Sequence, residues 1–327
     1  MRLSGVRAIS ALILATILSA PAWGYDRSAN MALPGTLNYI EGQASIGTQV
    51  LNVKSIGSDQ LQAGQTLATQ NGKAEILLTP GVFLRLDDHS SAKMISPNLT
   101  NTELAIARGE AMVEVAEIHK ANDIRIVEDG ATTRLLKTGV YDFDAVHGQV
   151  RVFDGKAVVQ DGDREVNLKG GRELTLNTPG ELKARKFDKK GYEASDLYRW
   201  SSLRSSYLAE ASAQTAQIYV ADGWYGPGWL GAGWYWDPWF SAYTFIPADG
   251  MLFSPFGWGF YSPLVVYRAP VYWGGHRYFR DFDRGQEGRG LDRGTAGFHG
   301  PAMRAPSMSG FGEGFHGGIR TDLGGRR

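Results

Sequence analysis

The sequence predicts a mainly β protein: a sandwich or roll of short antiparallel strands, followed by one α-helix and a Gly- and aromatic-rich, partly disordered C-terminal region. The first observation behind this prediction is a series of short apolar runs bounded by turn residues, which is typical of strands. The clearest runs are residues 73–78 (KAEILL), 82–86 (VFLRL), 110–115 (EAMVEV) and 124–127 (IRIV).

The second observation is that residue pairs favouring tight turns recur every seven to nine positions later in this region. These pairs are His147-Gly148, Asp154-Gly155, Asp161-Gly162 and Gly170-Gly171. Asp-Gly and Gly-Gly pairs supply the positive φ angles that two-residue hairpin loops need. We therefore expect a hairpin at each pair, within a β domain over residues 35–178.

A secretory signal peptide is expected at residues 1–22. Two arginines in the first seven positions precede an apolar run over residues 9–20, and Ala20-Pro21-Ala22 then offers the small-x-small pattern of a cleavage site. The run is too short to cross about 30 Å of hydrocarbon, so an uncleaved anchor is the less favoured alternative. The mature chain is expected to begin near Trp23, or at Tyr25, and to be periplasmic or extracellular.

One helix is predicted after the β domain, over residues 193–219. Ser195 or Asp196 can serve as N-cap, because their side chains accept hydrogen bonds from the first free amides. Apolar residues then follow one stripe at 3.6-residue spacing, with Arg204 as its polar member. This stripe predicts packing on the β domain rather than a coiled coil or a membrane-surface helix. The packing residues are expected to be Leu197, Trp200, Tyr207 and Leu208.

Residues 220–282 form a segment rich in Trp, Tyr, Gly and Pro, and residues 283–327 form a Gly/Arg-rich tail that is expected to be disordered. Prolines interrupt the aromatic segment every seven to eleven residues from Pro227 onwards, which leaves room only for short strands, turns and polyproline-like pieces. The uncharged run at 250–267 contains two of these prolines, so it is not expected to span a membrane.

The tryptophans of the aromatic segment are the candidate interaction surface. Their rings can stack on sugars, lie at a lipid headgroup layer, contact a protein partner, or collapse into an apolar wrap over the β domain and helix. The candidate residues are Trp224, Trp229, Trp234, Trp236, Trp239, Trp258 and Trp273.

The sequence gives no sign of an enzyme, a cofactor site or a metal site. It has no cysteine, so disulfides and thiolate ligands are excluded. Residues 226–231 satisfy G-x-G-x-x-G, but Pro227 and Trp229 occupy the loop and no βαβ rhythm surrounds it. The adjacent residues 87–89 (DDH) are assigned to a turn, because neighbours on a strand end point to opposite sides. Equal numbers of basic and acidic residues, 34 each, leave no electrostatic footprint for nucleic acid.

Several segments of the β domain resemble the FecR family. They are 61–67 (LQAGQTL), 72–78 (GKAEILL), 137–143 (KTGVYDF), 150–159 (VRVFDGKAVV) and 168–174 (LKGGREL). The resemblance covers residues 35–178 and implies a periplasmic β module with structural rather than catalytic motifs. FecR regulators pass a signal from an outer-membrane iron receptor to a sigma factor, through a cytoplasmic segment and a membrane span. Neither part is recognised in this sequence, so the resemblance carries over the fold alone.

We therefore expect an exported, non-catalytic envelope module that acts by binding or scaffolding. An envelope protein or a glycan is the expected partner, with peripheral membrane contact as a further alternative. Nucleic acid and disulfide-linked partners are not expected. The alternative function is that of a regulatory sensor in FecR-type envelope signalling, which involves TonB-dependent receptors and sigma factors.

Overall fold

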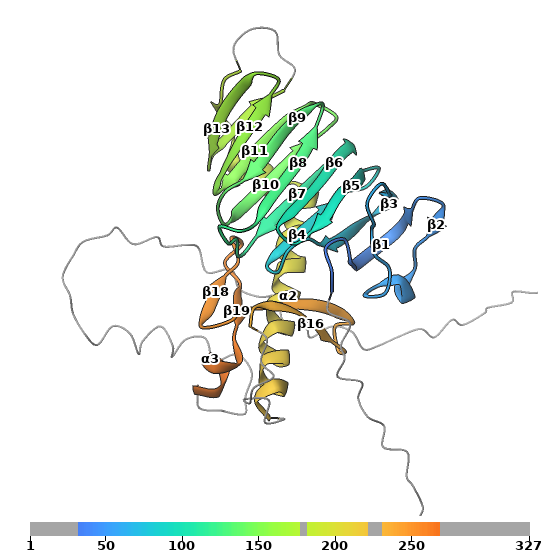
Figure 1. Ribbon diagram of the computed structural model, residues 1–327, viewed down its shortest axis with the longest axis vertical. Coiled ribbons are helices and arrows are strands. Elements are labelled where there is room, and N and C mark those ends of the chain that lie inside the picture. The colour runs from blue at the N-terminus through green and yellow to red at the C-terminus, as the bar shows by residue number, and fades with distance from the viewer. Residues whose placement is uncertain (1–31, 177–181, 222–230, 269–327) are drawn as a thin grey trace, which may run out of the picture. The chain divides into compact units, whose positions relative to one another are not determined.

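The computed structural model describes residues 32–176, 182–221 and 231–268. Within these residues, fifteen strands belong to one sheet (Figure 1). In chain order they are β1 (Leu37–Ile46), β2 (Gln49–Val50), β3 (Thr66–Leu77), β4 (Val82–Leu86), β5 (Ser91–Asn98), β6 (Asn101–Arg108), β7 (Glu110–Val115), β8 (Asp123–Glu128), β9 (Ala131–Leu135), β10 (Gly139–Asp144), β11 (Gln149–Asp154), β12 (Lys156–Asp161), β13 (Arg164–Lys169), β14 (Arg172–Thr175) and β15 (Arg185–Lys186).

The remaining elements include a 3-10 turn after β2, two short helices, one long helix and two small hairpins. They are η1 (Val53–Ser55), α1 (Lys189–Glu193), α2 (Asp196–Ala221), β16 (Gly233–Asp237), β17 (Ala242–Ile246), β18 (Met251–Phe253), β19 (Gly259–Tyr261) and α3 (Pro263–Arg268). In the part of the chain that is described, no helix has both the length and the apolar character needed to cross a membrane.

The sheet folds on itself at β3. The first half of β3 pairs with β5 and its second half pairs with β4. Strands β5, β6, β8, β9, β12 and β13 therefore follow one another in a first layer, and β4, β7, β10, β11, β14 and β15 in a second. One parallel pair, β6–β8, interrupts the antiparallel pattern, because β7 carries the chain to the second layer and back between them.

Apolar side chains of the two layers meet in one core. Leu84 and Val113 of the second layer belong to the same buried cluster as Leu104 and Ile126 of the first. The strands predicted at 82–86 and 110–115 coincide with β4 and β7. The predicted fold class, a mainly β protein followed by a helix, is thus confirmed.

The turn pairs make two kinds of connection, so the prediction of a hairpin at every pair is wrong. His147-Gly148 joins the paired strands β10 and β11, and Asp161-Gly162 joins the paired strands β12 and β13. Asp154-Gly155 and Gly170-Gly171 instead carry the chain from one layer to the other. At Gly155 φ is 103°, and a Cβ would meet the Tyr141 hydroxyl at 2.3 Å, so this corner requires glycine.

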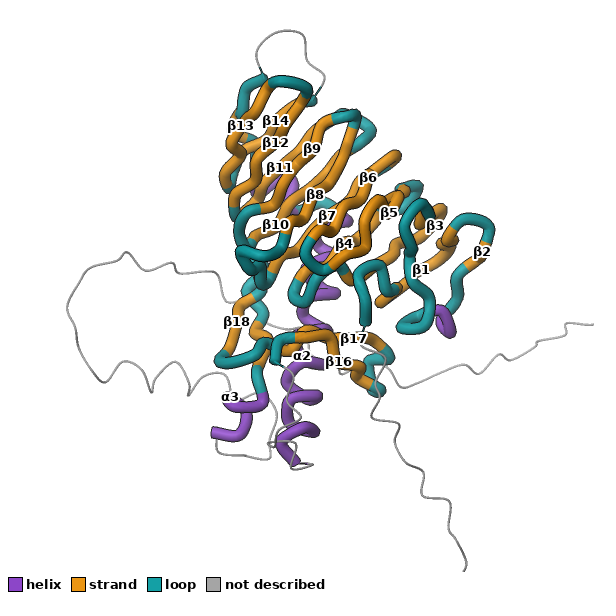
Figure 2. Tube along the Cα trace, viewed as in Figure 1, coloured by secondary structure: helices purple, strands orange, loops and turns teal. Residues whose placement is uncertain are grey.

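Helix α2 begins directly after Ser195, whose Oγ accepts a hydrogen bond from the backbone N–H of Tyr198 at 3.3 Å. The helix lies beside β7 and beside strands β16, β17 and β19 (Figures 1 and 2). We call α2 together with the hairpins β16–β17 and β18–β19 the C-terminal cover. Its buried face contains several small polar residues, among them Ser201, Ser205 and Ser212.

The four expected packing residues of the helix have different surroundings. Leu197 and Leu208 are buried. Trp200 is half-buried, and its Nε1 donates to Glu41 Oε2 at 2.9 Å. Tyr207 is 46% exposed and its ring lies 6.3 Å from that of Phe240, so the expectation that it packs on the β domain is wrong. The helix contacts charged residues on the outer face of the sheet through Arg204 and Ser205 instead.

Candidate functional site

Three charged side chains occupy the outer face of the second layer: Glu75 on β3, Arg85 on β4 and Glu114 on β7. All three are fully buried. Arg85 lies between the two acids, because its Nε donates to Glu75 Oε2 and its Nη1 to Glu114 Oε2, each at 2.7 Å. The three groups leave one net negative charge, and a buried charge without a partner is costly. This face therefore needs a cation from elsewhere.

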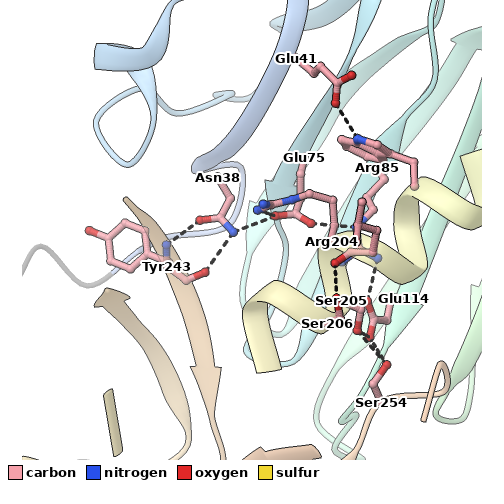
Figure 3. Close-up of polar contacts among 12 residues, drawn as sticks. Asn38, Glu41, Glu75, Arg85, Glu114, Arg204, Ser205, Ser206, Tyr243 and Ser254 are labelled. Atoms are coloured by element: carbon pink, nitrogen blue, oxygen red, sulfur yellow. Dashed lines mark hydrogen bonds and ion pairs between the residues drawn. The ribbon is translucent and has the colours of Figure 1, made fainter. Parts of the chain in front are cut away.

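Helix α2 supplies that cation. Arg204 Nη2 donates to Glu75 Oε1 at 3.0 Å (Figure 3). Burial alone would raise the pKa of Glu75, but the charges of Arg204 and Arg85 outweigh it and hold the pKa at about 2. The two acids and two arginines together are neutral. The net negative charge on the sheet is thus cancelled by the positive charge on the helix.

Serine hydroxyls attach two parts of the C-terminal cover to β7. Ser205 Oγ on α2 donates to Glu114 Oε1 at 2.7 Å. Ser254, which follows β18, donates to the same oxygen (Figure 3). The second carboxylate oxygen of Glu114 is therefore satisfied by the cover, which removes the cost of burying it unpaired.

The β16–β17 hairpin is fixed to the sheet through Asn38 on β1. Asn38 Nδ2 donates to Glu75 Oε1 at 2.9 Å and to the backbone carbonyl of Tyr243 at 3.0 Å. The backbone N–H of Tyr243 donates back to Asn38 Oδ1 at 2.7 Å (Figure 3). All three parts of the cover therefore converge on one buried polar network.

Two of the candidate tryptophans are part of the packing of the cover. Trp234 is only 6% exposed, and its ring meets Phe83 of β4 edge-on at a centroid distance of 4.9 Å. The interpretation of Trp234 as part of an interaction surface is therefore wrong. Trp236 is half-buried beside Tyr243, and a Cβ on Gly57 would lie 2.5 Å from its Cζ3. Both rings bury the apolar part of the sheet's outer face, as the wrap alternative expects.

Two other candidates reach solvent. Trp239, in the turn between β16 and β17, is 81% exposed, and Trp258, just before β19, is 41% exposed. Trp224, Trp229 and Trp273 lie outside the described residues. Of the described candidates, Trp239 thus has the most accessible ring.

A buried acid stabilises the turn that carries Trp239. Asp237 is fully buried, and its Oδ1 accepts hydrogen bonds from the backbone N–H groups of Trp239 at 2.8 Å and Phe240 at 3.0 Å. Its Oδ2 accepts from Thr215 Oγ1 on α2 at 2.9 Å. Pro238 restricts the backbone further. Trp239 is therefore presented on a pre-organised turn that is anchored to the helix.

Apolar side chains on α2 extend this exposed region. Tyr207 neighbours Phe240, as described above, and Leu203 lies one helical turn earlier on the same face and is 50% exposed. We call Leu203, Tyr207, Trp239 and Phe240 the aromatic surface. It combines a rigidly held indole with a helix face, which is an arrangement suited to binding rather than to bond chemistry.

The sequence contains few signals for this arrangement. It identified Arg204 as a polar residue in an apolar stripe, but its partner Glu75 cannot be found from local spacing. Asp237 and Pro238 before Trp239 form a recognisable turn sequence, which could have indicated a fixed aromatic tip. Within the described residues, no group of His, Asp or Glu side chains could hold a metal ion.

Part of the sheet matches a known protein family. The FecR protein family matches residues 65–160, from the start of β3 to β12, and the sheet extends beyond this match on both sides. No curated protein sequence is significantly similar to the chain.

Two crystal structures of a protein from Parabacteroides distasonis, provisionally described as an anti-sigma factor, are similar to part of the chain. They were determined at 2.50 and 1.65 Å. Each has 16% sequence identity and a TM-score of 0.34, and the match covers 38% of this chain and 61% of the other. The C-terminal cover lies outside the FecR match, whereas most of both sheet layers lies within it. Residues 65–160 of this protein are a FecR domain.

Proposed function

We propose that this protein is an exported, non-catalytic FecR module that binds an envelope partner through the aromatic surface. The observation that carries the proposal is the exposure of Trp239 on a turn fixed by a buried aspartate. A rigid aromatic side chain loses little conformational entropy on binding and buries a large apolar area, so such residues dominate many interfaces. An envelope protein or a glycan face is the expected partner.

The C-terminal cover supports this role by giving the surface a stable base. Its contacts with the sheet are numerous, buried and charge-neutral, so the aromatic surface is a fixed feature of the folded protein. Export follows from the signal-peptide pattern at residues 1–22, which lies outside the described residues.

The experiment is a capture of partners from isolated cell envelope by the purified full-length mature protein. Trp239→Ala should reduce the amount of partner captured at least about tenfold, as expected for loss of a central aromatic anchor. Trp258→Ala is the matched control, because it removes an exposed indole from the other hairpin. Equal capture by wild type and Trp239→Ala would refute the role of the aromatic surface.

A second candidate function is that of a sensor in FecR-type envelope signalling, and the FecR match at residues 65–160 favours it. In that case the captured partner would be a membrane-associated regulator or receptor. Deleting the gene would then change transcription of a sigma-factor regulon. Intact transcription together with loss of an envelope assembly would support scaffolding instead.

A further inference from the structure

A cavity of about 410 Å³ lies at the edge of the first layer, where β8 begins and β9 ends. The connection from β7 to β8 forms one wall with Ile118, His119 and Lys120, and the end of β9 forms the other with Arg134 and the following Leu136. The volume falls within the range of small-molecule sites. This cavity is formed by the FecR sheet and is separate from the C-terminal cover.

The loop wall is fixed by hydrogen bonds. Asn122 Oδ1 accepts from the backbone N–H of His119 at 2.9 Å, and Asn122 Nδ2 donates to the carbonyl of Leu99 at 3.0 Å. The backbone N–H of Asn122 also donates to the His119 carbonyl at 2.9 Å. The loop is thereby tied to the β5–β6 turn, so the wall is pre-organised.

The cavity has an unbalanced positive charge. Its acid, Asp123, pairs with Arg125 on the same strand. His119 lies 3.5 Å from Glu117. Lys120 and Arg134 are exposed and have no acidic partner among the residues that the structure describes. The lining therefore carries two cations, Lys120 and Arg134, against one acid, Asp123.

Arg134 also occupies an unfavourable position on the sheet. It lies directly opposite Arg125 in the β8–β9 pair, and both side chains point outward because their neighbours Ile124 and Leu135 are buried in the core. Like charges directly opposite each other destabilise a sheet. Arg125 is compensated by Asp123, whereas Arg134 is not. A negative group beside Arg134 would remove this repulsion.

We propose that the cavity binds a small organic anion, with one carboxylate or phosphate group on a body about the size of a monosaccharide. Arg134 and Lys120 hold the anionic group through charge-assisted hydrogen bonds. Ile118 on the loop wall and Leu136 on the β9 wall provide apolar contacts for the body of the ligand. This proposal is independent of the aromatic surface.

The test measures the melting temperature of the full-length mature protein with glucuronate, with glucose 6-phosphate and with neutral glucose. The anions should raise the melting temperature and glucose should not, and the effect should shrink as salt is added. The anion that acts identifies the preferred group, carboxylate or phosphate. No shift with either anion, or an equal shift with glucose, would overturn the proposal.

Variants separate binding from a structural role. Arg134→Gln and Lys120→Gln should each weaken anion binding at least tenfold. Without ligand, Arg134→Gln should melt at the same temperature as wild type or higher, because the like-charge pair is gone. Lys93→Gln, which removes an exposed cation from β5 in the same layer, should bind normally. Loss of binding in Lys93→Gln, or a lower ligand-free melting temperature in Arg134→Gln, would contradict the site.

Discussion

Arg204 on α2 and Glu75 on β3 are 129 residues apart in the sequence, and their side chains meet at 3.0 Å in the buried network beneath the C-terminal cover. This ion pair neutralises the charge that Glu75, Arg85 and Glu114 leave on the sheet. Separating the helix from the sheet would break this buried pair, so we expect the FecR sheet and the segment after it to unfold together.

Arg204→Met should lower the free energy of unfolding by about 3 kcal/mol, because removing one partner of a buried pair leaves the other uncompensated. Arg85 and Asn38 still contact Glu75 in the variant. The loss of stability should therefore lie at the lower end of the range of about 3–5 kcal/mol for breaking a buried ion pair. Urea unfolding of the full-length mature protein measures it. Arg199→Met, on the exposed side of the same helix, is the control and should leave the midpoint unchanged. Equal midpoints for both variants would show that the cover is not coupled to the sheet.

Glu110 makes stability depend on pH. Burial and the neighbouring carboxylate of Asp142 raise the pKa of Glu110 to about 8, from an ordinary value near 4.5. Between these values the folded protein holds a proton that the unfolded chain releases. The contribution of Glu110 to the free energy of unfolding is therefore fully present below about pH 4.5 and declines as the pH rises towards 8.

Glu110→Gln should flatten this decline, because glutamine mimics the protonated acid. The melting temperature of the variant should exceed that of wild type above pH 8, while Glu165→Gln, an exposed acid on β13, should behave like wild type. A variant with the full wild-type pH dependence would exclude Glu110 as its source.

The tryptophans of the cover should differ in their effect on stability. Trp234→Ala should cost about 3–5 kcal/mol, because its ring is buried against Phe83. Trp239→Ala should stay within about 0.5 kcal/mol of wild type, because its ring is mostly in solvent. Trp200→Ala should lose an intermediate amount of stability, because the ring of Trp200 is half-buried. Denaturant midpoints of the three variants give the order, and a large loss for Trp239→Ala would mean that its ring packs in solution.

The strands were predictable from sequence because their apolar residues are local signals. The run at 82–86 predicts the location of β4, but nothing in that run indicates that the side chain of Arg85 is buried. The structure buries Arg85 because a segment over a hundred residues later covers that face. Likewise, Asp154-Gly155 indicates a turn from its sequence alone, whereas only strand pairing decides whether the turn makes a hairpin or crosses between layers.

The candidate site was predictable only in its composition. The abundance of tryptophan identified the segment, but the burial of Trp234 and the exposure of Trp239 depend on which side of the β16–β17 hairpin faces the sheet. That orientation is fixed by Asn38, whose partner Tyr243 lies 205 residues away, and by Asp237, whose partner Thr215 on α2 lies 22 residues away.

Asp237 should control binding through the rigidity of the turn that carries Trp239. Asp237→Ala removes both backbone hydrogen bonds to residues 239 and 240, so the indole stays exposed but must be ordered when a partner binds. That entropy cost should weaken capture of the envelope partner about tenfold. Thr215→Val is the matched control, since it removes only the bond between the helix and Asp237 and leaves the turn closed. Both variants should lose about 1–3 kcal/mol of stability, because each leaves a buried polar group unpaired. Capture should nevertheless fall much further in Asp237→Ala. If capture falls equally in the two variants, it follows global stability, and the fixed turn has no separate part in recognition.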